Sequence, residues 1–162
     1  MTWHLAQLNV ARPLAPLDSP KLAEFVAQLA PINALAEAAP GFIWRLVGDG
    51  GDATSVRVDD PTIIVNMSVW QTPEALFDFV YKTAHAKVMA RRREWFDRMQ
   101  TFVVLWWIPA GHVPTVAEAM GRLALLEANG PSPEAFTFKQ RYPAPGSLGG
   151  PTDMKPEPYC VP

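Results

Sequence analysis

The segment from His85 to Phe96 contains the side chains whose types and spacing could most readily do chemistry. If it is one helix, with about 100° between residues, His85 and Arg92 lie on the same face, beside apolar side chains. An imidazole next to a guanidinium on an apolar wall could bind a carboxylate, an enolate or another anion. His85 could also act as an acid or base, or as an axial ligand of haem iron. We therefore predict His85 and Arg92 as the catalytic residues. The alternative is that His85 begins the helix and Arg92 extends to solvent.

Polar and aromatic side chains in the expected strands are candidates for binding a ligand. Asn9 and Asn66 interrupt runs that indicate burial, and a buried amide needs hydrogen-bond partners from a ligand or from the protein. Tryptophans either fill the core or line a pocket for a planar ligand. The predicted ligand-binding residues are Asn9, Trp44, Asn66, Trp70, Trp95 and Trp106. We expect a small hydrophobic or aromatic ligand in a pocket between the sheet and the helices.

Several motifs that would indicate other chemistry do not occur in the sequence. There is no GxGxxG after a strand, no P-loop, no CxxC pair, no HExxH and no GxSxG. The histidines His4, His85 and His112 have no metal-ligand spacing, and Cys160 in the C-terminal tail is a poor nucleophile candidate. We therefore predict no metal and no cofactor, with haem at His85 as the alternative.

Composition narrows the class of partner. The formal net charge of −2 gives no electrostatic case for binding nucleic acid. No apolar run approaches the roughly 20 residues of a membrane span, so we expect no membrane partner. The single cysteine, Cys160, rules out a disulfide within the chain and favours a cytoplasmic protein.

The order of strand and helix patterns predicts an α+β fold. Runs rich in β-branched and aromatic residues indicate strands at Trp3–Val10, Phe42–Val47, Thr62–Trp70 and Thr101–Ile108. Helical patterns follow Ser19-Pro20 and Thr72-Pro73, resume through His85–Met99, and return in a third helix at Thr115–Asn129. This βαββαβ order, with an extra C-terminal helix, predicts a ferredoxin-like sandwich. Its four-stranded antiparallel sheet carries the two crossover helices on one face.

Residues 1–141 are predicted to form one domain. Inside it, the polar connection Gly48–Pro61 is expected to be a mobile loop, and Glu134–Lys139 a short edge strand or an arm. Residues 142–162 are dominated by Pro and Gly with little to bury, so we predict a disordered or draped tail.

The strand at Thr62–Trp70 is largely apolar on both faces, so both sides of the sheet need cover. The two crossover helices can cover only one of them. The other side is covered either by the third helix or by the sheet of a second copy. We predict the second arrangement, a homodimer in which two sheets stack face to face.

The order of motifs along the chain resembles one bacterial family. The stretches that carry the resemblance are Gly41-Phe-Ile-Trp-Arg-Leu46, Ser68-Val-Trp70, Glu74-Ala-Leu76, Phe79-Val-Tyr81, His85, Met89, Arg92-Arg-Glu-Trp-Phe96, Leu105-Trp-Trp-Ile-Pro-Ala-Gly-His112-x-Pro-Thr115 and Pro133-Glu-Ala-Phe-Thr-Phe138. They cover nearly everything except the tail. That family has no known function and is assigned to the dimeric α+β barrel superfamily, so the resemblance implies this fold and a dimer.

The wider superfamily includes antibiotic-biosynthesis monooxygenases, which often work without a cofactor, as well as haem-degrading and haem-peroxidase relatives. The resemblance therefore implies a small-molecule-binding protein, as a cofactor-independent monooxygenase-like or isomerase/cyclase-like enzyme of secondary metabolism. One alternative is a haem-binding oxidoreductase with His85 as axial ligand. Another is a non-catalytic dimeric module that binds a ligand.

Overall fold

The computed structural model describes residues 1–153, and residues 154–162, with Cys160, lie outside this part. The strands are β1 (Trp3–Ala11), β2 (Phe42–Arg45), β3 (Ile64–Trp70), β4 (Val103–Pro109), β5 (Gln140–Arg141) and β6 (Thr152–Asp153). The α-helices are α1 (Ala23–Ala38), α2 (Pro73–Lys82), α3 (His85–Ala90) and α4 (Val116–Asn129), and the two 3-10 turns are η1 (Pro20–Leu22) and η2 (Arg92–Glu94). None of the helices within residues 1–153 has the length and apolar character needed to cross a membrane.

The four long strands form one antiparallel sheet in the order β2-β3-β1-β4. This order, with α1 and α2 in the two crossovers, is the predicted ferredoxin-like arrangement, and it confirms the α+β fold. In the register of β1 with β3, Gln7 lies opposite Ser68 and Asn9 lies opposite Asn66. Since alternate residues share a face, these four polar side chains lie on the same side of the sheet.

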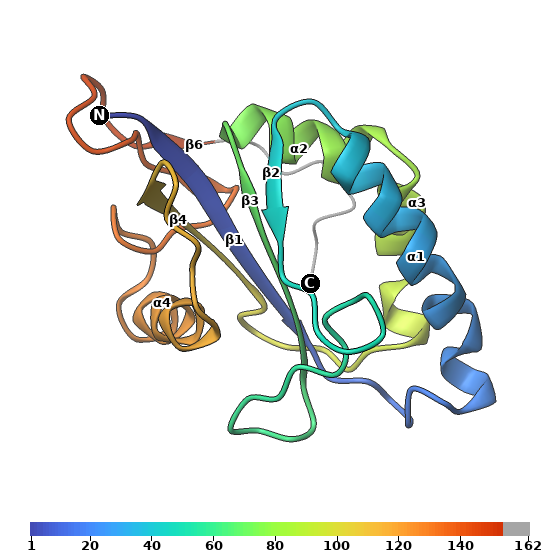
Figure 1. Ribbon diagram of the computed structural model, residues 1–162. Helices are drawn as coiled ribbons and strands as arrows, with labels where there is room; N and C mark the ends of the chain where they lie inside the picture. Colours follow the sequence, from blue (N-terminus) through green and yellow to red (C-terminus); the bar gives the residue numbers. More distant parts are fainter. Residues whose placement is uncertain (154–162) are drawn as a thin grey trace.

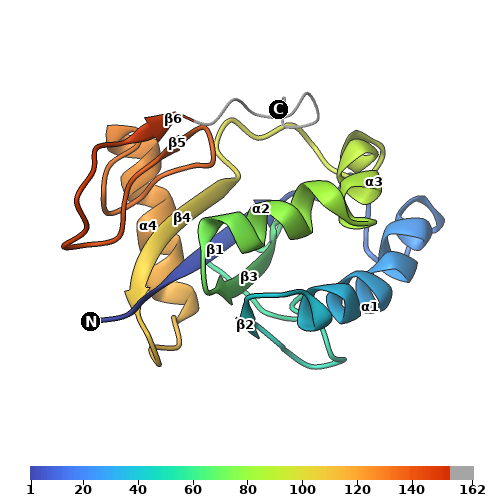
Figure 2. The same ribbon diagram turned by 90° about the horizontal axis from the view of Figure 1, so that it is seen from above.

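Helices cover both sides of the sheet (Figures 1 and 2). We call the side that carries α1, α2 and α3 the α2 face, and the opposite side, against which α4 packs, the α4 face. The core of the α2 face contains Leu5, Trp70, Leu76, Phe79, Leu105 and Phe136. The core of the α4 face contains Leu8, Met67, Trp106, Ala119, Leu123 and Leu126. Successive residues of a strand point to opposite faces, and here both sets are largely apolar because each set faces its own core.

The cover of the α4 face corrects the argument for a dimer. Besides α4, the connection between β2 and β3 contributes Leu46, Val56 and Val58 to this core. Strand residues on this face, such as Leu8 and Met67, are almost fully buried within the single chain. A second copy is therefore not needed to bury the α4 face. The homodimer remains a prediction that rests on the resemblance.

The expected helix starts are largely correct. The Thr72 side chain accepts a hydrogen bond from the Ala75 amide, and the Thr115 side chain accepts one from the Glu118 amide, both at 3.1 Å. These are N-caps, which satisfy amides that the first helical turn leaves unpaired. Ser19 differs, because its hydroxyl donates to a carbonyl upstream and the 3-10 turn η1 precedes α1.

The continuous helix predicted over His85–Met99 is not formed. α3 ends at Ala90, and the short turn η2 at Arg92–Glu94 follows it. The amide of Leu14, in the connection after β1, donates to the carbonyl of Trp95 at 2.8 Å. Because the backbone here bonds to a distant segment, it does not continue the helical ladder.

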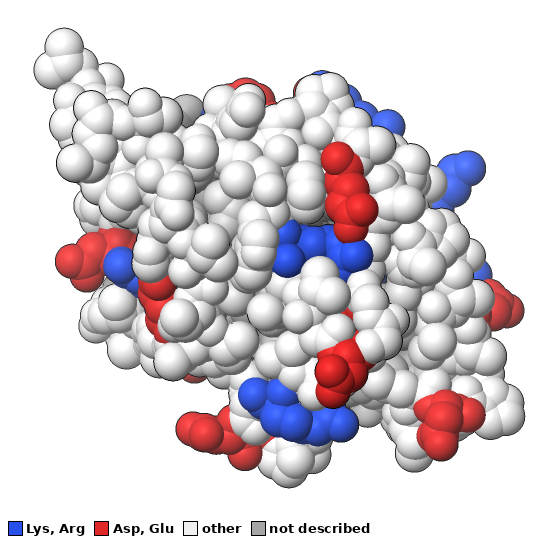
Figure 3. Space-filling view, in the orientation of Figure 1, with Lys and Arg blue, Asp and Glu red and all other residues white. Residues whose placement is uncertain are grey.

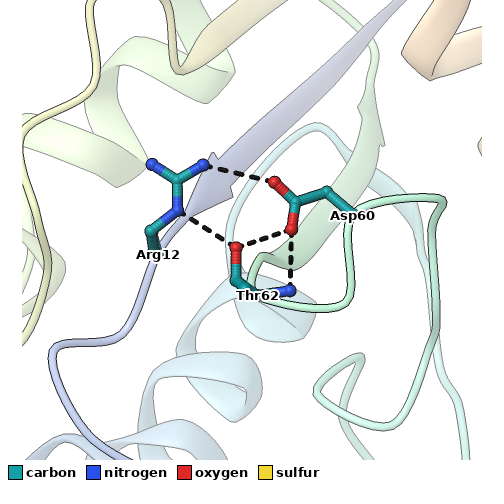
Figure 4. A network of polar contacts seen from close by, with 3 residues as sticks. All are labelled: Arg12, Asp60 and Thr62. Atoms are coloured by element: carbon teal, nitrogen blue, oxygen red, sulfur yellow. Dashed lines mark hydrogen bonds and ion pairs between the residues drawn. The ribbon is translucent and has the colours of Figure 1, made fainter.

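An exposed polar cluster fastens the β2–β3 connection to the end of β1 (Figure 4). Asp60 accepts hydrogen bonds from the hydroxyl and the amide of Thr62, and Arg12 contacts both residues, with its Nη2 3.2 Å from the Asp60 carboxylate. The hydrogen bonds from Thr62 and then from Arg12 outweigh the opposing desolvation and lower the pKa of Asp60. On the face shown in Figure 3, basic and acidic groups lie in small clusters separated by uncharged surface.

The C-terminal part of the domain adds a minimal edge to the sheet. Within the predicted strand or arm Glu134–Lys139, only Phe136 pairs with Leu105 of β4, through two backbone hydrogen bonds. Further on, β5 and β6 form a two-stranded ribbon, and the Trp107 indole donates to the Tyr142 carbonyl at 2.9 Å.

Replacing Leu123 by Ala tests whether α4 is an integral cover of the sheet. Leu123 is 5% exposed, whereas Leu35 on α1, the matched control, is 41% exposed. We expect Leu123→Ala to lower the free energy of unfolding by about 2–5 kcal/mol, because it leaves a cavity in the core. Leu35→Ala should lower it by less than ~1 kcal/mol. Urea unfolding followed by tryptophan fluorescence measures both. Equal losses would contradict the placement of α4.

Candidate functional site

A polar cluster lies at the centre of the α2 face, surrounded by apolar residues. Gln7 Nε2 donates to Asn66 Oδ1 at 3.1 Å and to Ser68 Oγ at 3.0 Å. Ser68 Oγ also accepts from Trp70 Nε1 at 2.8 Å. Gln7 and Ser68 are buried, and Trp70 is fully buried. The hydrogen bonds explain how a sheet centre can hold buried polar groups, since each would otherwise lose its bonds to water.

The two predicted asparagines lie side by side on this face, as Cα partners in the β1–β3 ladder. Asn9 is half-buried and Asn66 is exposed, although β3 is an inner strand. Within residues 1–153, the Asn9 side chain makes no hydrogen bond, and the Asn66 side chain makes only the one with Gln7. The pair therefore presents amide groups that a ligand could bind.

His85, at the start of α3, is neutral and has one available ring nitrogen. Its Nδ1 lies 3.2 Å from the Val80 carbonyl, which can only accept, so Nδ1 carries the proton. Burial lowers the pKa of His85, and the bond to Val80 opposes this only in part. Nε2 has no partner in the described chain, where every buried side-chain nitrogen or oxygen has one, so Nε2 is accessible. A neutral imidazole of this kind could accept a proton or bind a ligand.

Aromatic rings connect His85 to the polar cluster. The His85 ring lies 5.0 Å from the Phe79 ring, and Phe79 stacks on Trp70 at 5.2 Å. Phe42 packs edge-on against the same indole. Trp70 is therefore a core residue that donates its indole N–H to Ser68 and so helps to fix the position of the polar cluster.

Arg92 is not on one helix face with His85, since the helix ends between them. Its guanidinium carbon lies 3.9 Å above the Phe102 ring, a cation–π contact. Phe102 precedes Val103, the β4 partner of Asn9, but it packs with the core of the α4 face. The contact therefore places Arg92 at that end of the sheet and not beside the two asparagines. A hollow of about 20 Å³ beside it is lined by Arg92, Arg93, Phe96, Asp97, Arg98 and Met99.

The other predicted tryptophans do not join this site. Trp44 and Trp106 pack in the core of the α4 face, on the other side of the sheet from Asn9 and Asn66. Trp95 is buried near α1, with its ring 5.7 Å from that of Phe25. One pocket therefore cannot contain all six predicted ligand-binding residues.

A second polar cluster, on the α4 face, was not predicted. Glu118 Oε1 accepts from Trp106 Nε1 at 2.9 Å, and Oε2 lies 2.7 Å from His112 Nε2. Burial opposes the ionisation of Glu118, but the hydrogen bonds from His112 and then Trp106, with the charge of Arg122, outweigh it, so the pKa of Glu118 is lowered. The sequence Thr115-x-x-Glu118 is typical of a capping box, but the Glu118 side chain bonds to His112 and Trp106 in place of the Thr115 amide.

Gln7 and Ser68 are the site residues that the sequence analysis missed. A signal was present, because Gln7 and Asn9 are two apart, as are Asn66 and Ser68. Such spacing places both members of each pair on one face of a strand. Only the register shows that the two pairs meet. Within residues 1–153, no group of three or more His, Cys, Asp or Glu side chains is arranged to hold a metal ion.

Comparison with protein families identifies the chain. A family model described as a domain of unknown function (DUF3291) matches residues 4–149. The chain belongs to this family. The match confirms the resemblance found in the motifs, and DUF3291 itself carries no assigned activity. No curated protein matches the chain.

Solved structures with a similar fold are distant in sequence. SnoaB, a cofactor-independent oxygenase from Streptomyces nogalater, is 15% identical over 68% of this chain and 95% of its own, with a TM-score of 0.45. Rv0793 from Mycobacterium tuberculosis is 13% identical over 69% of this chain and 99% of its own, with a TM-score of 0.48. MupZ from Pseudomonas fluorescens is 14% identical over 92% of this chain and 100% of its own, with a TM-score of 0.43. At these values the likeness carries no argument about activity.

Glu118→Gln tests the cluster on the α4 face. The glutamine amide can still accept a hydrogen bond from Trp106 but cannot ionise. We therefore expect the free energy of unfolding to fall by about 1–2 kcal/mol at pH 7. A lowered pKa means that the ionised carboxylate stabilises the fold above its ordinary pKa of 4.5. This contribution disappears as the pH falls through the lowered value. Urea unfolding from pH 7 to pH 3 should therefore show the two proteins converging.

The exposed Glu127, on the same helix, provides the control. Glu127→Gln should change the unfolding free energy by less than ~0.5 kcal/mol at any of these pH values. A Glu118→Gln deficit that is independent of pH would show that the charge of Glu118 has no role.

Proposed function

We propose that this DUF3291 protein binds a small aromatic molecule on the α2 face, above Asn9 and Asn66. The observation that supports this most strongly is the exposed amide of Asn66 in the middle of an inner strand. A buried sheet face normally carries apolar side chains or polar groups that bond to one another. Here two adjacent amides keep hydrogen-bonding capacity on a face whose core contains the rings of Trp70 and Phe79, a combination suited to a planar ligand with a polar edge.

In the enzymatic form of this proposal, the substrate supplies its own reactivity and the protein assists with proton transfer. His85 is the candidate base, because it is neutral and its Nε2 is accessible. The amides of Asn9 and Asn66 would stabilise the oxyanion that remains after the proton leaves. These roles suit a cofactor-independent monooxygenase-like reaction or an isomerase/cyclase-like one.

Binding of 1-naphthol, a planar phenol, tests the proposed site. We expect saturable binding to the wild type by isothermal titration calorimetry. Asn66→Ala should weaken it roughly tenfold, which corresponds to about 1.4 kcal/mol for the loss of one good hydrogen bond. Asn129→Ala, at the end of α4, is the matched control and should bind as the wild type does.

Equal affinity in Asn66→Ala and the wild type, or the absence of saturable binding, would contradict the proposed site. Binding of 1-naphthol without any oxygen uptake or product would favour a ligand-binding module over an enzyme.

Haem binding is the second candidate, and one observation favours it. Histidines that bind metals commonly donate their other N–H to a backbone carbonyl, as His85 does to Val80. The hollow beside Arg92 does not support it. Its volume of about 20 Å³ is far below the roughly 300–1,000 Å³ of a cofactor pocket, and His85 is not among its lining residues. The imidazole is suitable as a donor, but this hollow does not fit a haem.

Hemin titration of the wild type and of His85→Ala decides this point. We expect a flat response, with no saturable Soret shift in either protein, because the hollow beside Arg92 is far smaller than a porphyrin and is not lined by His85. A saturable shift that is lost in His85→Ala would overturn this expectation and make haem the cofactor.

A further inference from the structure

We infer that Gln7 is a positioning residue that turns the Asn66 amide so that its N–H group faces the ligand, which favours a ligand with an acceptor oxygen. The orientation of Asn66 stands on the hydrogen bonds alone. The statement about the ligand rests on the proposed function. Carbonyl, quinone and ionised phenol or enol oxygens are acceptors of the required kind.

The orientation begins at Trp70, whose indole N–H can only donate. This makes Ser68 Oγ an acceptor, with one lone pair occupied at 2.8 Å. Gln7 Nε2 approaches the second lone pair at 3.0 Å. An amide nitrogen has two hydrogens, and the second lies toward Asn66 Oδ1 at 3.1 Å. Both hydrogens of Gln7 are therefore used inside the cluster.

Burial makes this orientation persistent. Gln7 is 8% exposed, Ser68 is 7% exposed and Trp70 is fully buried. Turning the Gln7 amide over would bring its oxygen against Asn66 Oδ1, so both amides would have to turn together. A turn of Gln7 alone is costly, because two acceptors would then meet in a place with little water and neither would gain a bond. A joint turn would instead require the Ser68 hydroxyl to donate to Gln7 Oε1.

The consequence for the site is a defined polarity. Gln7 takes one lone pair of Asn66 Oδ1, while Nδ2 has no acceptor within residues 1–153. Asn66 therefore offers two hydrogens to the space above the sheet. A donor on the ligand would meet only the remaining lone pair of Oδ1 and the neighbouring Asn9 amide. The polarity at Asn66 is thus set by its bond to Gln7.

The orientation is tested without any ligand by NMR of uniformly ¹⁵N-labelled full-length protein. The side-chain NH₂ signals of the two residues are assigned by their loss in Gln7→Met and Asn66→Ala. We expect the Gln7 amide hydrogens to exchange with water at least about tenfold more slowly than those of Asn66, because only the former are hydrogen-bonded inside the protein. Similar exchange rates, or slower exchange at Asn66, would overturn the inference.

The preference for an acceptor oxygen is tested with two planar probes. 1,4-Naphthoquinone can accept hydrogen bonds but cannot donate them, and naphthalene can do neither. We expect the wild type to prefer the quinone about tenfold. This preference should fall to about twofold or less in Asn66→Ala, which removes the donor. It should also fall in Gln7→Met, which keeps the length of the side chain but releases Asn66. Ratios of affinity are used because a general loss of packing would weaken both probes alike.

The two proposals fail in different ways. If Asn66→Ala leaves the quinone preference unchanged, or if the wild type binds neither probe, the proposed function fails, and the NMR result alone decides the orientation of Asn66. If Asn66→Ala removes the preference while Gln7→Met keeps it, the site stands and the positioning role of Gln7 is overturned.

Discussion

The structure depends on one constraint, which is that its central sheet is apolar on both faces and must be covered twice by a single chain. The two crossover helices cover one face, with α3 on the same side, while α4 and the β2–β3 connection cover the other. Burial of this kind contributes roughly 25 cal/mol for each Å² of apolar surface. The same need for cover explains the helix α4 after the four strands, since without α4 Trp106 and its neighbours would be exposed.

Against this apolar background, each face carries one polar cluster, and the two clusters differ in what they leave available. On the α4 face, Glu118 is occupied on both oxygens by Trp106 and His112, so it joins the helix to the sheet. On the α2 face, Ser68 Oγ and both amide hydrogens of Gln7 are bonded inside the cluster, while the asparagines keep unused capacity. Buried groups that satisfy one another stabilise a fold, and groups with capacity left over can bind a ligand.

The position of His85 connects the fold to the proposed chemistry. Its ring is held by the Val80 carbonyl and by contact with Phe79, which itself stacks on Trp70. The same aromatic core that buries the sheet therefore orients the candidate base and supports the polar cluster. Arg92 lies instead over Phe102, which precedes β4 and packs with the core of the α4 face.

Much of the fold could be derived from the sequence by itself. Local patterns are sufficient for strands with two apolar faces, for caps such as Thr72 and Thr115, and for the βαββαβ order, because each depends on neighbouring residues. The same patterns placed Asn9 and Asn66 on strands. Only the tertiary structure decided that they lie together, that Trp44 and Trp106 face the other way, and that the helix after His85 ends at Ala90. Register and backbone contacts between distant segments decide such points, and they leave no periodic trace in the chain.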